Sequence, residues 1–120
     1  MKIAICAPFM RSDLWQERLR RASPDQHMEF DEFYRPEDVR GVSRFRYGAC
    51  VVAMAGAMGL EAAIAVRERD ADVPLLWLSD DSQFGLEAFR LQAVMFLGLD
   101  CSDQELEEAM RKVYEKGKSA

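Results

Sequence analysis

The sequence predicts a doubly wound α/β domain, in which helices cover both faces of a five-stranded parallel sheet. Five short apolar runs alternate with segments of helical character, and the joints between them are short. The third and fourth runs are apolar throughout, as expected for central strands that are buried on both faces. Alternation of this kind favours crossover connections and a parallel sheet between two helical layers.

The strands are expected where apolar residues run on continuously or alternate with polar ones. They cover residues 2–7, 27–33, 48–54, 73–78 and 93–97. Pro8 ends the first run, because proline cannot donate a hydrogen bond to a neighbouring strand. The second run alternates, with Met28 and Phe30 on one face, and therefore predicts a half-exposed strand.

The helices are expected where apolar residues recur at helical spacing after a capping residue. They cover residues 13–22, 36–45, 58–69 and 82–89, with a last helix after residue 102. Ser12 or Asp13 caps the first, Pro36 opens the second, and Asp81 or Ser82 caps the fourth. The last begins with the capping box Ser102-Asp-Gln-Glu105.

Length and charge restrict the functions to be considered. The chain has 120 residues, enough for one domain, which we place at residues 1–116 with a tail or linker remnant at 117–120. Its 16 basic and 21 acidic residues give a net charge of −5, so the domain is expected to bind no nucleic acid directly. No apolar run is long enough for a membrane span, and the first residues lack the layout of a signal peptide. We expect a cytoplasmic protein.

The loops after the strands, where ligands bind on such folds, are poor in reactive groups. Asp80, Asp81 and Asp100 are the only acids near that edge. The single His27 and three widely spaced cysteines offer no metal-ligand pattern. We therefore expect no cofactor, no metal and no enzymatic activity.

One enzymatic alternative concerns the loop after the first strand. Cys6 and Arg11 there resemble the phosphate-binding loop of low-molecular-weight tyrosine phosphatases and phosphocysteine transport domains. The phosphatase loop has five residues between cysteine and arginine, whereas this loop has four. It also contains Pro8 in place of an amide donor and has no glycine. The alternative is remote.

The second half of the chain resembles a known family. The stretches YGACVVAMAGAMGLEAAIAVRERDADVP and LLWLSDDSQFGLEAFRLQAVMFLGLDCSDQELEEAMRKV are similar to receiver domains of two-component response regulators, in particular the LytTR (LytR/AlgR) class. Ser79 matches the switch serine or threonine of that family, and Phe96 its switch aromatic. The resemblance implies a flavodoxin-like, three-layer receiver fold in phosphorelay signal transduction.

The family's phosphorylation site is degenerate in this sequence. Receivers bind magnesium through two acids after the first strand, accept the phosphoryl group on an aspartate after the third, and contact it with a lysine after the fifth. The acids match Ala7 and Pro8, the aspartate matches Ala53 with its neighbour Met54, and the lysine matches Leu99. Asp100 matches the proline that follows the lysine in the family. The resemblance therefore implies a pseudo-receiver whose apolar rim, together with Phe9, either packs shut or forms a small apolar pocket.

We expect this domain to act as a phosphorylation-independent interaction or dimerisation module. Its partner would be a second copy of the chain or another signalling protein. The family's partner face corresponds here to Phe84, Phe89, Arg90, Leu91 and Tyr114. In the alternative, the chain is the regulatory half of a LytTR-type transcription regulator, dimeric through this half, and its DNA-binding domain lies outside these residues.

Overall fold

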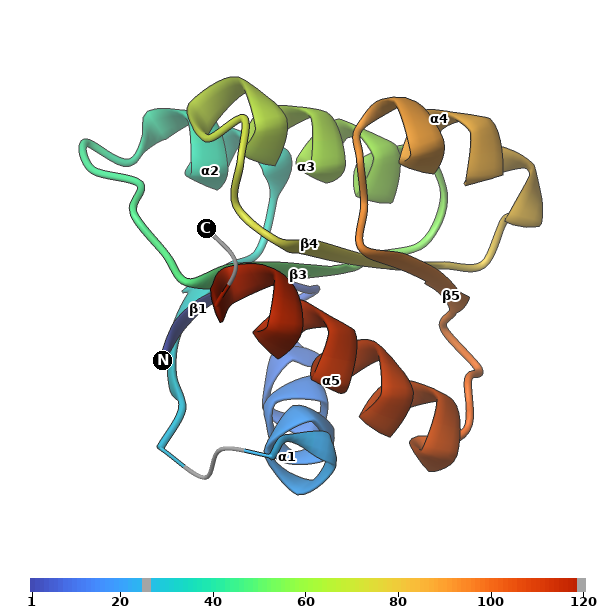
Figure 1. Cartoon of the computed structure of the whole chain (residues 1–120). Helices are drawn as coiled ribbons and strands as arrows, with labels where there is room; N and C mark the ends of the chain where they lie inside the picture. The colour runs from blue at the N-terminus through green and yellow to red at the C-terminus, as the bar shows by residue number, and fades with distance from the viewer. Residues whose placement is uncertain (25–26, 119–120) are drawn as a thin grey trace.

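The computed structural model describes residues 1–24 and 27–118, and within them five parallel strands form one sheet (Figure 1). The strands are β1 (Lys2–Cys6), β2 (Glu29–Phe33), β3 (Ala49–Ala53), β4 (Leu75–Ser79) and β5 (Met95–Gly98). The helices are α1 (Ser12–Ala22), α2 (Pro36–Gly41), α3 (Gly56–Arg69), α4 (Gly85–Arg90) and α5 (Asp103–Lys118), with a 3-10 turn, η1 (Ser82–Phe84), before α4. The strand order is β2-β1-β3-β4-β5. The predicted fold class is confirmed.

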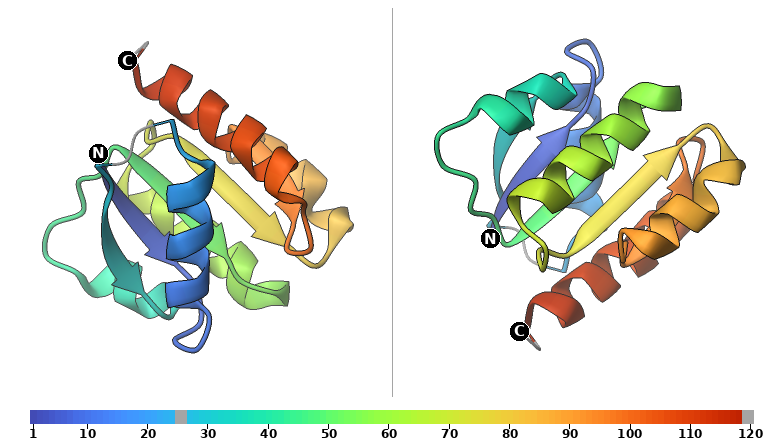
Figure 2. Two further views of the ribbon diagram at one scale, coloured as in Figure 1. Left: turned by 90° about the horizontal axis from the view of Figure 1, so that it is seen from below. Right: turned by 90° about the horizontal axis from the view of Figure 1, so that it is seen from above.

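The helices form one layer on each face of the sheet. Helices α2, α3 and α4 lie on one face, and α1 and α5 lie side by side on the other (Figures 1 and 2). Among the described helices, none is both long and apolar enough to cross a membrane.

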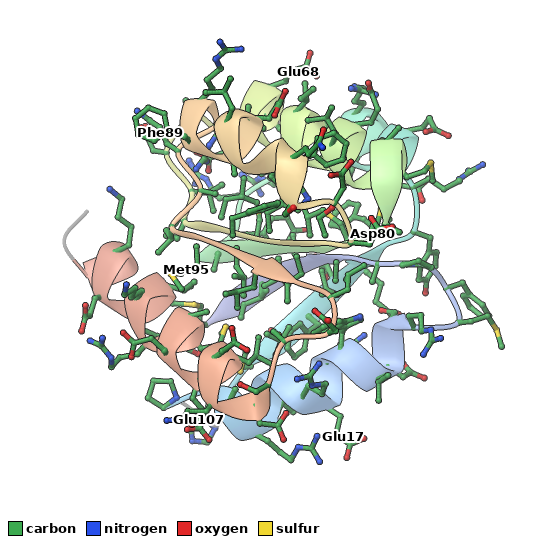
Figure 3. All side chains as sticks on the ribbon, turned by 90° about the vertical axis from the view of Figure 1, so that its right-hand side faces the viewer. Glu17, Glu68, Asp80, Phe89, Met95 and Glu107 are labelled. Atoms are coloured by element: carbon green, nitrogen blue, oxygen red, sulfur yellow. The ribbon has the colours of Figure 1, made fainter. Side chains whose placement is uncertain are left out.

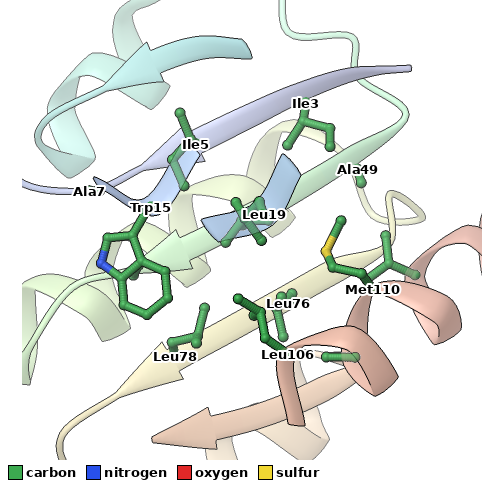
Figure 4. Packing of buried hydrophobic residues seen from close by; sticks show 14 of the residues in the cluster. Ile3, Ile5, Ala7, Trp15, Leu19, Ala49, Leu76, Leu78, Leu106 and Met110 are labelled. Atoms are coloured by element: carbon green, nitrogen blue, oxygen red, sulfur yellow. The ribbon is translucent and has the colours of Figure 1, made fainter. Parts of the chain in front are cut away.

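Alternation along the central strands sends side chains into two separate cores. Ile3 and Ile5 of β1 point toward α1 and α5, where they meet Leu19 and Met110 (Figure 4). Cys6 of the same strand points toward α2 and α3. Because both faces of β1, β3 and β4 are covered, their residues are buried almost without exception, as the continuous apolar runs predict.

Helix α2 ends at Gly41, four residues before the predicted end at Phe45. The cause lies in α3, because Arg69 Nη1 donates to the carbonyl oxygens of Val39 (2.7 Å) and Arg40 (3.1 Å). The Arg69 guanidinium also lies 5.7 Å from the centre of the Phe45 ring. A long-range cation thus caps the last carbonyls of α2, which no local pattern predicts.

Several other element boundaries also differ from the prediction. Helix α3 begins at Gly56, whose φ of 60° favours glycine, and not at Met58. Ser12 does not cap α1, since its hydroxyl is buried and donates to Glu32 Oε1 (2.7 Å). Strand β5 begins at Met95, two residues late, after Gln92 takes a φ of 55°.

The helix signals in the second half of the chain are confirmed. Ser102 and Glu105 form the reciprocal capping box, with Ser102 N donating to Glu105 Oε1 (3.0 Å) and Glu105 N donating to Ser102 Oγ (3.1 Å). Asp81 Oδ1 accepts a hydrogen bond from Gln83 N at the start of η1. Helix α5 continues through residues 117 and 118, which we expected to belong to the tail. Ser119 and Ala120 lie outside the described residues, so the domain boundary stays a prediction.

Candidate functional site

The carboxyl edge of the sheet carries two adjoining hollows. The first, here called the α1 pocket, has a volume of about 450 Å³ and is lined by Pro8, Arg11, Leu14, Trp15, Arg18, Ala53, Ala55, Leu99 and Asp100. The second, the β4–β5 pocket, has a volume of about 550 Å³ and is lined by Ser79, Asp80, Ser82, Phe96, Leu97, Gly98, Leu99 and Asp100. The loop after β5 therefore separates two hollows and contributes to both.

Four of the six residues predicted for the degenerate site line the α1 pocket. They are Pro8, Ala53, Leu99 and Asp100. Ala7 and Met54 do not line it, because both are buried and pack into opposite cores. Sequence reasoning missed the wall that α1 supplies, although Arg11, Leu14, Trp15 and Arg18 recur at helical spacing.

Of the two arrangements expected for the apolar rim, the structure has the open one, because Phe9 points away from it. The Phe9 side chain is 70% exposed and packs edge to face on Tyr34, with the ring centres 5.3 Å apart. The aromatic pair anchors the loop after β1 to the end of β2 and leaves the α1 pocket open.

Ser79 and Phe96, the switch-like residues, lie in the β4–β5 pocket. Ser79 is buried and its Oγ accepts a hydrogen bond from Asp81 N (3.1 Å). Phe96 packs edge to face on Trp77, with ring centres 5.1 Å apart. On the other side of Trp77, Phe84 stacks at 5.7 Å and 19°. Phe84, a candidate for the partner face, therefore packs partly against the core of α2, α3 and α4.

The acids at this edge are few, and Asp80, like Asp81, already has a structural partner. Asp80 Oδ1 accepts a hydrogen bond from Gly56 N (2.8 Å) at the beginning of α3, and Asp80 lies at the end of the sheet (Figure 3). Asp100 Oδ1 folds back over Gly98, 2.5 Å from where a β-carbon on that glycine would lie. No cluster of three or more histidine, cysteine or acidic side chains suited to a metal occurs in the described part of the chain.

The donor set at this edge does not fit the magnesium ion that receivers use. Magnesium is held by oxygen ligands, usually one or two carboxylates that converge on it. Here Ala7 and Pro8 follow β1 and Ala53 ends β3, and none of these side chains has an oxygen. Asp80 and Asp100 follow β4 and β5 instead, and Asp80 is engaged by α3.

The cysteine loop gives no support to the phosphatase alternative. Cys6 is fully buried inside β1, and burial raises the pKa of its thiol to about 12. The amides of Arg11 and Ser12 donate to the carbonyl oxygen of Pro8 (2.8 and 3.0 Å), so they close a turn and do not converge on an anion. A nucleophilic cysteine needs a lowered pKa and accessible loop amides.

The remaining predicted interface residues divide into exposed and packed ones. Phe89 is 81% exposed and projects from α4 into solvent (Figure 3), and Arg90 beside it is exposed as well. Leu91 is half-buried against the core that Trp77 belongs to. Tyr114 is half-buried between α5 and α1, where its hydroxyl oxygen accepts a hydrogen bond from Ser23 Oγ (3.0 Å).

One residue that holds α4 in place carries no functional signal in the sequence. Arg67 of α3 recurs at helical spacing with the apolar residues Leu60, Ala63 and Ile64. It donates to the carbonyl oxygens of Leu91 (2.6 Å), Val73 (2.6 Å), Gln92 (3.1 Å) and Asp70 (3.2 Å). Arg67 thereby ties the C-terminal end of α4 to the loop before β4.

Comparison with known proteins identifies the fold. No protein-family model matches the chain, and no curated protein matches it in sequence. Among solved structures, the response regulatory domain of mrkE from Klebsiella pneumoniae aligns over 100% of both chains, with a TM-score of 0.76 and 16% identity. The REC domain of AraT, a response regulator from Geobacillus stearothermophilus, aligns over 98% of this chain and 95% of its own, with a TM-score of 0.73 and 24% identity.

A third structure is similar to the same extent. The response regulator TrrA from Thermotoga maritima, in complex with Mg²⁺-BeF, aligns over 93% of this chain and 97% of its own, with a TM-score of 0.71 and 20% identity. At these identities the likeness is one of fold. The chain therefore has the fold of response-regulator receiver domains.

Proposed function

We propose that this domain is a pseudo-receiver, a protein-interaction module of signal transduction that works without phosphorylation of an aspartate. The observation that carries the proposal is the chemistry at the ends of β1, β3 and β5, where Ala7, Pro8, Ala53 and Leu99 stand. Phosphoryl transfer to a carboxylate needs a nucleophile, a divalent ion and a cation for the charge on the phosphoryl oxygens. None of these four side chains supplies any of the three.

The surface of α4 supports an interaction role. Phe89 (81% exposed) and Leu86 (55% exposed) are two of the most exposed large apolar side chains of the described residues, and Arg90 lies next to them. Exposed aromatic residues and arginine are enriched at the centres of protein interfaces. Because most homodimers are symmetric, one such surface is sufficient for self-association.

The test is the oligomeric state of matched variants. Phe89→Asp places a charge in the proposed interface, whereas Phe9→Asp makes the same change at an exposed phenylalanine on the loop after β1. Light scattering over a range of concentrations is expected to show a dimer for the wild type and Phe9→Asp, and a monomer for Phe89→Asp. A dimer that survives Phe89→Asp, or a wild type that is monomeric throughout, contradicts self-association through α4.

The LytTR-class relationship and the DNA-binding alternative remain predictions. They share the dimerisation step with the proposal and differ in requiring an effector domain on the natural chain. Detection of the native protein by an antibody against this domain separates them. A mass near 13.7 kDa supports a separate module, whereas a much larger mass supports an attached effector.

A further inference from the structure

The α1 pocket has the size and lining of a small-molecule site, and the interaction role proposed above does not use it. Its volume of about 450 Å³ lies within the range of about 300–1,000 Å³ that ligand pockets span. Most of its lining is apolar: Pro8, Leu14, Trp15, Ala53, Ala55 and Leu99. Such a lining favours a ligand with a hydrocarbon body.

The position of the pocket in the fold also favours ligand binding. Its floor is formed by Pro8 after β1, Ala53 at the end of β3 and Leu99 after β5. Strands β1 and β3 are neighbours in the order β2-β1-β3-β4-β5. The chain leaves β1 for β2 on one side and then returns to β3 on the other, so the connections diverge at this point. Open α/β sheets bind ligands at the carboxyl edge beside such a divergence.

Arg11 supplies an unpaired positive charge at the pocket. Its guanidinium makes no hydrogen bond or ion pair with any residue that the structure describes, and the side chain is exposed. Arg18, about two helical turns after Arg11, instead donates hydrogen bonds to Cys101 O (2.9 Å) and Asp103 Oδ1 (3.0 Å). Its guanidinium also lies over the Trp15 ring. A ligand therefore meets one free cation, Arg11, beside an apolar floor.

We propose that the α1 pocket binds a small apolar monocarboxylic acid. Its carboxylate pairs with the planar guanidinium of Arg11, which can donate two parallel hydrogen bonds. Its hydrocarbon part covers Pro8, Ala53 and Leu99 on the pocket floor. Asp100 makes the pocket unfavourable for a second negative charge, so one carboxylate is preferred to two.

Three probes with the same hydrocarbon tail test the choice of ligand. Octanoate, octanol and octylammonium are titrated into the ¹⁵N-labelled full chain, and amide shifts at Leu14, Ala55 and Leu99 are followed. Octanoate is expected to bind most tightly, octanol more weakly and octylammonium most weakly. Each methylene added from hexanoate upward is expected to tighten binding by up to about four-fold until the pocket is full.

Matched variants locate the binding site. Arg11→Gln is expected to weaken octanoate binding about five-fold and to remove its advantage over octanol. Arg21→Gln, on the same helix but outside the α1 pocket, is expected to leave octanoate binding unchanged. Ala55→Trp places a large ring at the exposed mouth and is expected to abolish binding of all three probes.

Two results would overturn the proposal. Octylammonium binding at least as tightly as octanoate would mean that Asp100 and not Arg11 selects the ligand. Absence of shifts at the pocket amides, or shifts that persist in Ala55→Trp, would mean that no acid binds there. Neither result bears on self-association through Phe89, because that surface lies on α4 on the other face of the sheet.

Discussion

Replacing Arg67 by methionine tests whether a single side chain secures the position of α4. Methionine keeps an unbranched apolar stem and removes four hydrogen bonds to backbone carbonyls. The two shortest, at 2.6 Å to Leu91 O and Val73 O, are partly buried. At about 1.5 kcal/mol for each charge-assisted bond, these two account for about 3 kcal/mol of the free energy of unfolding. The other two bonds are longer, and we assign them no further contribution.

Urea denaturation followed by circular dichroism measures this loss. With a slope of about 2 kcal/mol per molar, the midpoint falls by about 1.5 M. The control is Arg40→Met, because Arg40 pairs with exposed Glu61 (3.2 Å) and Glu68 (3.3 Å) and bonds no carbonyl. Exposed ion pairs contribute little, so the midpoint of the control should stay near that of the wild type. Equal midpoints for the two variants would refute the reasoning.

Three further predictions concern a glycine, a carboxylate and the thiols. Gly59→Ala is expected to lower the free energy of unfolding by about 1–3 kcal/mol, because its new β-carbon would lie 2.2 Å from Met54 O. Thermal denaturation measures this loss, with Gly85→Ala as the control, because a β-carbon there has no neighbouring atom within 4 Å. Hydrogen bonds, above all from Ser12, lower the pKa of Glu32 below 4.5, so its stabilising contribution is complete above pH 4.5 and is lost as pH falls through the folded pKa. Glu32→Gln should therefore lose less stability on acidification than the wild type, and equal losses in urea midpoints would contradict this. Burial raises the pKa of Cys6, so its native thiol should resist a thiol reagent at about pH 8, as read by mass spectrometry before and after unfolding; rapid native labelling at Cys6 would argue against burial.

The sequence predicts the fold well because the core obeys local rules. The continuous apolar run of β3 has buried neighbours on both faces, and the capping box at Ser102 fixes the start of α5. The end of α2 could not be predicted, because the group that caps it, Arg69, is distant in the sequence. Helix boundaries that depend on such contacts have no local signature.

The candidate site was predictable in part, because the order of strands and helices decides which loops meet. The residues that follow parallel strands meet at one edge, so Pro8, Ala53 and Leu99 were expected together, and the structure places them around one pocket. The sequence could not tell whether Phe84 or Phe89 packs inward, because a segment this short does not show which of its aromatics faces the core, and the structure stacks Phe84 on Trp77. Arg11 could not be recognised as a pocket residue, because its spacing from Cys6 points to a phosphate-binding loop, whereas the structure places it beside Leu14 and Trp15 in the pocket wall.

The central claim is that the domain works without phosphorylation of an aspartate, and intact-mass spectrometry tests it most directly. The protein is incubated with acetyl phosphate and Mg²⁺, beside a receiver domain whose acid cluster is intact. The account predicts that the mass of this chain stays unchanged while the control gains one phosphoryl group. A gain of one phosphoryl group that hydroxylamine removes, as it removes acyl phosphates, would contradict the account.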